Sequence, residues 1–144
     1  MSEGRISIID GSPAEDESAW LDVVNAKLDG VGFHTAMYSQ CLGGGLYDMA
    51  KIHKYRALEE YQELLCAVGE FVKLFGRPPR LAMSDPDVPS KIESNCQAIE
   101  LYEEWETETF NELRSAKNKM KDKRFVAQLI DDVIDELRSV ERMK

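Results

Sequence analysis

Two acids one helical turn apart, Glu60 and Glu63, lie in the stretch "ALEEYQELLCAV" at residues 57–68. The apolar residues of this stretch have helical spacing, and the two carboxylates fall on the side expected to be buried, close to Leu64. An ionised carboxylate among core residues must be paired, protonated or bound to a cation, because leaving it dry and unpaired costs more than folding supplies. The pair therefore predicts a buried polar centre, and its counter-charge decides its chemistry.

Other polar residues fall on the inner faces of the expected helices when each helix is followed in steps of three and four residues. The acids found in this way are Glu60, Glu63, Glu103, Glu106 and Glu136, and the bases are Lys27, His34 and Arg56. Carboxylates from several facing helices are the usual ligands of two metal ions inside a helix bundle. Oxygen donors with few nitrogens suit iron or manganese, or magnesium and calcium.

Four helical segments are needed to position these residues, and we expect them at 12–45, 46–75, 90–118 and 125–143. Capping boxes at "SPAE" and "PSKIE" begin the first and third segments. The glycines of "LGGG" end the first, and "GRPP" ends the second, because glycine permits a turn and proline cannot continue a helix. The only strand-like pattern, "RISII" near the start, is too isolated to build a sheet.

The lengths of these segments predict a four-helix bundle formed by one domain, residues 12–144, after an N-terminal tail, residues 1–11. The breaks after the first and third segments are short enough only for antiparallel neighbours. The link at 76–89 can extend to roughly 45 Å, which is enough to run the length of the bundle. We therefore expect an all-α fold of two antiparallel helix pairs joined by a long crossover.

The net charge, the apolar runs and the cysteine spacing argue against several classes of function. The net charge of −9 over 144 residues argues against a nucleic-acid surface, and no apolar run is long enough for a signal peptide or a membrane span. Cys41, Cys66 and Cys96 are far apart in the sequence and lack zinc-binding spacing, so we expect reduced thiols in the core of a cytoplasmic protein.

The second segment also carries an apolar stripe, and the apolar coverage of this segment is wider than one bundle face needs. The residues of the stripe are Leu58, Tyr61, Leu65, Val68, Val72 and Phe75. We interpret this stripe as a second buried contact, made in a homo-oligomer. We expect the nearby His53 to lie at the surface.

In the order and spacing of its four segments, the chain resembles the ferritin-like superfamily over residues 21–143. The run "GLYDMAKIHKYRALEEYQELL" resembles the turn between the first two ferritin helices and the start of the second. "AIELYEEWETETFNEL" resembles the third helix, and "FVAQLIDDVIDEL" the fourth. The resemblance implies a ferritin-like bundle that binds iron, or else manganese or magnesium, with ferroxidase or iron-storage activity.

The resemblance also implies roles for individual residues. Glu60 falls on the bridging glutamate of the second helix, Glu63 on the ligand position that follows, and Glu103 on the glutamate of the third. Residues of the fourth helix are assigned by register, as Val133 and Glu136 or as Asp132 and Asp135, and His34 falls where the family tends to have a tyrosine close to the metals. The implied metal ligands are Glu60, Glu63, Glu103, Glu136 and His34.

The first helix departs from the family, because its ligand position holds Lys27 instead of a glutamate. An ammonium there would repel a dication and neutralise one carboxylate, so the centre holds either a metal or a lysine in its place. Two further functions stay open. "EEYQE" and "DDVID" resemble the magnesium-binding acids of MazG-type nucleotide pyrophosphohydrolases, and the apolar stripe suits a non-catalytic oligomeric scaffold.

Overall fold

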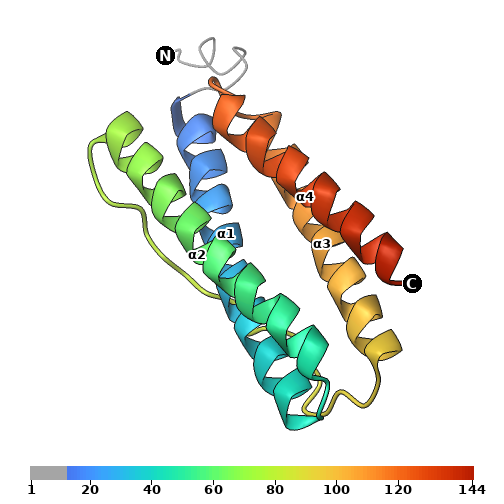
Figure 1. The fold of residues 1–144 in the computed structure, drawn as a ribbon. Helices are drawn as coiled ribbons and strands as arrows, with labels where there is room; N and C mark the ends of the chain where they lie inside the picture. The colour runs from blue at the N-terminus through green and yellow to red at the C-terminus, as the bar shows by residue number, and fades with distance from the viewer. Residues whose placement is uncertain (1–12) are drawn as a thin grey trace.

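The computed structural model describes residues 13–144 and consists there of four helices and their connections (Figure 1). The helices are α1 (Pro13–Gly43), α2 (Tyr47–Phe75), α3 (Asn95–Lys117) and α4 (Arg124–Met143). The predictions for the tail, for "RISII" and for the Ser12 cap lie outside the described residues. No helix within 13–144 is long and apolar enough to cross a lipid bilayer.

The helices form two antiparallel pairs, α1 with α2 and α3 with α4, and α1 also packs against α3. A tight turn at Gly44 and Gly45 joins the first pair, and Gly45 has a positive φ of 77° that favours glycine. Gly76 ends α2 in the same left-handed conformation, and its N–H donates to the Val72 carbonyl. The predicted bundle topology, with α2 and α3 starting at the same end, is confirmed.

The crossover, residues 76–94, runs along α1 from one end of the bundle to the other (Figure 1). Asn25 holds it with two hydrogen bonds, donating to the Arg80 carbonyl and accepting from the Ala82 N–H at 2.8 Å. The Ser84 N–H donates to Asp29 at 2.8 Å. The crossover therefore covers part of the outer side of α1.

Helix boundaries differ from the prediction mainly in the third segment. α3 begins at Asn95 instead of residue 90, and its cap is Ser94, whose hydroxyl accepts from the Gln97 N–H at 3.1 Å. The predicted capping box at Ser90 and Glu93 is therefore wrong. α1 is continuous through Gly30 and Gly32.

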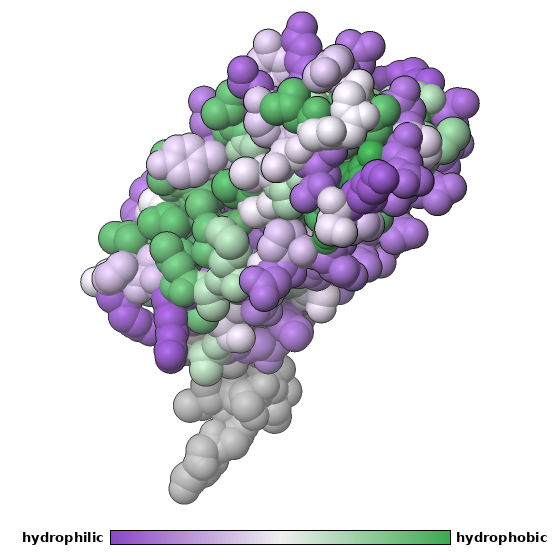
Figure 2. Space-filling model, turned by 90° about the horizontal axis from the view of Figure 1, so that it is seen from below, coloured by the Kyte–Doolittle hydropathy of each residue, from purple (hydrophilic) through white to green (hydrophobic). Residues whose placement is uncertain are grey.

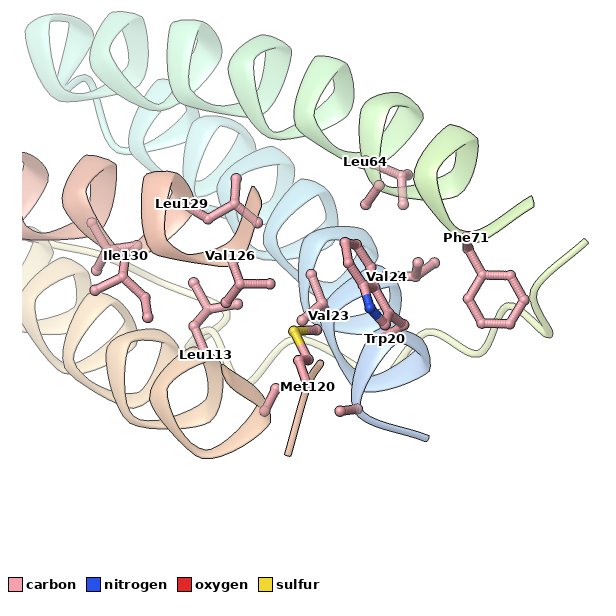
Figure 3. Packing of buried hydrophobic residues seen from close by; sticks show 14 residues of the cluster. Trp20, Val23, Val24, Leu64, Phe71, Leu113, Met120, Val126, Leu129 and Ile130 are labelled. Carbon is pink, nitrogen blue, oxygen red and sulfur yellow. The ribbon is translucent and has the colours of Figure 1, made fainter. Parts of the chain in front are cut away.

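A first apolar cluster, which we call the upper core, fills the bundle at the end where α1 and α4 begin (Figure 3). Its largest members come from all four helices and include Trp20, Leu64, Phe71, Leu113 and Leu129. A second cluster lies at the other end around Phe33, Met37 and Met49. Of the cysteines, Cys41 is buried there, whereas Cys66 and Cys96 are exposed, so their predicted place in the core is wrong.

Candidate functional site

One face of α2 is buried, and it is apolar at its two ends and polar in the middle. The buried residues of this face are Met49, Ala50, His53, Arg56, Glu60, Leu64, Ala67 and Phe71. Leu58, Tyr61 and Leu65 lie on the opposite side of the helix, and each is at least half exposed. The charged residues of the buried face must therefore be satisfied inside the bundle.

Lys27 of α1 provides one of their partners. Its ammonium Nζ lies 3.1 Å from Glu60 Oε2 and 2.8 Å from Glu63 Oε1, and the lysine side chain is 2% exposed. Glu60 packs directly on α1 at Gly30, where a Cβ atom would clash with Glu60 Oε1. The lysine therefore bridges the two carboxylates that first indicated a buried centre.

Arg56 provides the second cation, one turn before Glu60 on α2. Its Nη2 atom lies 3.4 Å from Glu60 Oε2 and 4.0 Å from Glu106 Oε1, and its Nε atom lies 3.2 Å from Glu136 Oε2. Its Nη1 atom donates a hydrogen bond to the more exposed Glu59 at 2.9 Å. The guanidinium thus links acids of three helices.

Glu106 and Glu136 complete what we call the charged centre. It consists of Lys27, Arg56, Glu60, Glu63, Glu106 and Glu136. The Tyr102 hydroxyl donates to Glu136 in a short hydrogen bond, and Glu106 is 2% exposed with Oε2 unpaired within the described residues. Four carboxyl groups therefore face two cations.

Burial and the nearby charges set the pKa directions of the charged centre. Burial opposes the charge of Lys27, but the charges of Glu60 and Glu63 outweigh it and raise the lysine pKa above its ordinary value. Burial raises the pKa of Glu63, of Glu106 and of Glu136, although Lys27 opposes it at Glu63, both cations at Glu106 and Arg56 at Glu136. The charged form of the lysine is therefore favoured, while three of the acids take up protons more readily than a free glutamate.

A histidine pair adjoins the charged centre. His34 of α1 and His53 of α2 are fully buried and share a hydrogen bond between their Nδ1 atoms, 2.9 Å apart. Burial and the nearby Arg56 lower both pKa values, that of His53 to about 3. His34 Nε2 lies 3.5 Å from Glu106 Oε1. Burial therefore favours the neutral form of both rings, and the Nδ1–H of one ring donates a hydrogen bond to the Nδ1 of the other.

The predicted ligands are distributed unevenly over this arrangement. Glu60 and Glu63 converge on Lys27, and Glu136 reaches Arg56. Glu103 lies outside the centre, because both its oxygens accept from Lys144 at 2.8 Å near the end of α4. His34 faces His53 instead of the paired glutamates.

The acid that α3 contributes is Glu106 in place of Glu103. The buried residues of α3 run through Ala98, Tyr102, Glu106, Thr109, Leu113 and Ala116, a stripe that excludes Glu103. The small and aromatic residues of this stripe could have indicated its register. The prediction that His53 lies at the surface is also wrong, and its spacing of three before Arg56 was the available signal.

The fourth-helix register is resolved as Val133 and Glu136. Val133 is buried in the upper core, and Glu136 points to Arg56. Asp132 lies on the flank, where burial raises its pKa and the neighbouring Glu63 adds to the effect.

A divalent metal does not fit the charged centre as it stands. The oxygens of Glu60 and Glu63 that converge are already bridged by an ammonium, and a dication in the same position would meet its charge at contact distance. Among residues 13–144, no group of three or more His, Cys, Asp or Glu side chains is arranged to hold a metal ion.

The acids of the pyrophosphohydrolase alternative come together only in part, because Asp132 of "DDVID" neighbours Glu63 of "EEYQE" and the others lie apart. Asp131 and Asp135 are exposed on α4, Asp135 beside Arg138, whereas Glu60 is buried against α1. The magnesium-binding arrangement suggested by "EEYQE" and "DDVID" is therefore not formed by these side chains.

Comparison with known proteins supplies a structural relative. No family model matches the sequence, and no curated protein matches it. The fold is similar to that of a bacterioferritin from Rhodobacter capsulatus, described with a metal-free dinuclear site and a heme iron in a crystallographic special position. The TM-score is 0.77 at 16% identity, over 93% of this chain and 85% of the bacterioferritin chain. This chain therefore has the ferritin-like four-helix bundle fold.

Proposed function

We propose that this chain is a self-associating helical subunit of ferritin-like fold, whose charged centre is structural. The observation that carries the proposal is the apolar row that α2 leaves exposed opposite its buried face. The helix buries Arg56 and Glu60 and leaves a row of large apolar side chains exposed on its outer side. We call this row the outer stripe, and its members are Tyr55, Leu58, Tyr61, Leu65 and Val72.

Several features favour a second copy of the chain as the partner of the outer stripe. A straight apolar row on one helix pairs with itself when two copies meet antiparallel, because a two-fold interface uses the same surface twice. The crossover lies along α1 and leaves the outer side of α2 open. Figure 2 shows a group of apolar residues at the surface of the face that it draws, with hydrophilic residues interspersed among them.

Iron binding is the competing proposal for the same fold. The excess of carboxylates over cations favours it, since four acids face only Lys27 and Arg56. The ammonium of Lys27 between Glu60 and Glu63 opposes it. We therefore propose a structural role for the centre in place of ferroxidase or iron-storage chemistry. We also propose that the protein works in the cytoplasm, where its free cysteines stay reduced.

The experiment is light scattering coupled to size-exclusion chromatography of the full chain. We expect the wild-type chain to form a dimer or a larger assembly. Leu58→Lys combined with Leu65→Lys should shift it to the monomer, because two ammonium groups cannot be buried at the centre of an apolar contact.

A matched control adds the same two charges on an exposed side of another helix. Asn111 and Ser115 lie one turn apart on the exposed side of α3. Asn111→Lys with Ser115→Lys should leave the assembly intact. A wild-type chain that is monomeric at all concentrations would refute the proposal.

A further inference from the structure

We infer that Lys27 is a built-in counter-ion that takes the place of a divalent cation, and that residue 27 alone keeps this bundle independent of metal. The charged centre has the components of a cation site, with acids from α2, α3 and α4 converging mid-bundle. In this chain α1 supplies the cation covalently.

The position of the ammonium is the first step. Lys27 Nζ contacts one oxygen of Glu60 and one of Glu63, at 3.1 and 2.8 Å. Bridging of two carboxylates is what a bound cation would do, and a lysine does it without dissociating. The pair Glu60 and Lys27 is almost completely buried, so water supplies little of the compensation.

The second step is a carboxylate oxygen of the charged centre that has no hydrogen-bond partner among the described residues. Glu106 Oε2 is buried and unpaired within the described chain, and the charges of both Lys27 and Glu63 act on this carboxyl group. Removing the ammonium would therefore leave Glu63 without its cation and would leave Glu60 and Glu106 to share Arg56. Acids placed in this way must take up protons or a cation.

The third step is the contrast with Arg56. Its guanidinium is divided among Glu59, Glu60, Glu106 and Glu136, so it does not occupy the space between Glu60 and Glu63. Only Lys27 does, and one substitution there should convert the centre from one state to the other.

The experiment compares Mn(II) binding by the wild-type chain, Lys27→Met and Lys27→Glu, using electron paramagnetic resonance for free Mn(II) and thermal unfolding for stability. We expect no binding or stabilisation in the wild-type chain. Lys27→Met should bind Mn(II) with a Kd at least roughly tenfold below the highest Mn(II) concentration at which the wild-type chain shows no binding. Lys27→Glu should bind more tightly still, and Mn(II) should raise the Tm of both variants.

Two controls separate position from charge. Lys144→Met removes an ammonium from the exposed pair with Glu103, so it changes the net charge equally but not the charged centre. Lys27→Arg keeps the positive charge in place. Neither should gain Mn(II) binding.

Either of two results would overturn the inference. One is stoichiometric Mn(II) or Fe(II) binding by the wild-type chain, and the other is no gain of binding in both Lys27 variants. If Lys27→Met does not fold alone, refolding with Mn(II) decides, since recovery supports the inference and continued failure opposes it. The outer stripe of α2 is separate from the charged centre, so the oligomeric state can fail its own test without changing this one.

Discussion

The upper core and the charged centre lie in one bundle and draw on the same four helices, yet they are held together differently. Each residue of the upper core, such as Leu113 or Val133, is stabilised by removal of its own apolar surface from water. Residues of the charged centre depend on one another, because Glu60 without Lys27 is a buried charge left with only the longer contact to Arg56. Substitutions in the upper core should therefore lower stability independently of one another, whereas loss of one member of the charged centre should destabilise its partners as well.

The largest expected effect comes from removing one member of the charged centre. Lys27→Met should lower the free energy of unfolding at neutral pH by about 3–5 kcal/mol, measured in urea without added metal, because the buried Glu60 keeps only its longer contact with Arg56. Adding Glu60→Gln and Glu63→Gln should restore more than half of the loss. Leu113→Ala in the upper core should cost about 2–5 kcal/mol and gain nothing from those two substitutions.

A loss in the triple variant as large as the sum of separate losses would contradict this account, because the three residues would then act independently.

A smaller effect is expected where Glu60 meets α1. Gly30→Ala places a Cβ atom against Glu60 Oε1 and must push the carboxylate from Lys27. We expect a loss of about 1–3 kcal/mol by chemical denaturation. Gly69→Ala on α2 is the matched control, since its added Cβ meets no neighbouring atom within 4 Å. It should be neutral or stabilising, because alanine favours the helix. Equal effects at the two glycines would contradict the close packing of Glu60.

The histidine pair should make stability depend on pH. The pKa values of His34 and His53 are lowered, so as pH falls below 6.5 the unfolded chain binds protons that the folded chain refuses, and stability is lost. The raised pKa values of Glu63 and Glu106 act in the opposite direction over the acid range. A comparison with His53→Gln isolates the histidine contribution.

Between pH 7 and pH 5.5 the wild-type chain should lose about 1 kcal/mol more stability than His53→Gln, from urea unfolding at both pH values. Parallel losses in the two chains would show that His53 is not held neutral by burial.

The smallest effect is expected at the predicted ligand that lies outside the centre. Glu103 is partly exposed and paired with Lys144, and exposed ion pairs contribute little. Glu103→Gln should change the free energy of unfolding by less than about 0.5 kcal/mol, whereas Glu106→Gln should shift it measurably. A large loss of unfolding free energy in Glu103→Gln would indicate that Glu103 belongs to the charged centre.

Much of the fold could be predicted from the sequence because it depends on local signals. The glycines at Gly44 and Gly45, the "GRPP" stop and the length of the crossover determine the helix pairs and their order. The start of α3 could not be placed, since Ser90 and Ser94 are both plausible caps and only the packed chain favours the second.

The site was predictable only in part, because burial of a charge depends on partners far away in sequence. Glu60, Glu63 and Lys27 were found from their spacing, and they do converge. Glu106 was displaced from the ligand set by a one-turn error in α3, since Glu103 and Glu106 both lie on a similar stripe and only tertiary contacts choose between them. The arrangement of α2 was predictable from the same spacing, because Arg56 and Glu60 were expected inside the bundle, where they lie, and Leu58, Tyr61 and Leu65 on another side of the helix, where they are exposed.

The most direct test of the central claim is a crystal structure of the wild-type chain soaked in Mn(II), with anomalous diffraction used to locate the metal. We predict no anomalous peak in the charged centre, with Lys27 Nζ still within hydrogen-bonding distance of Glu60 and Glu63. A peak ligated by those two carboxylates, with the lysine displaced, would contradict the account.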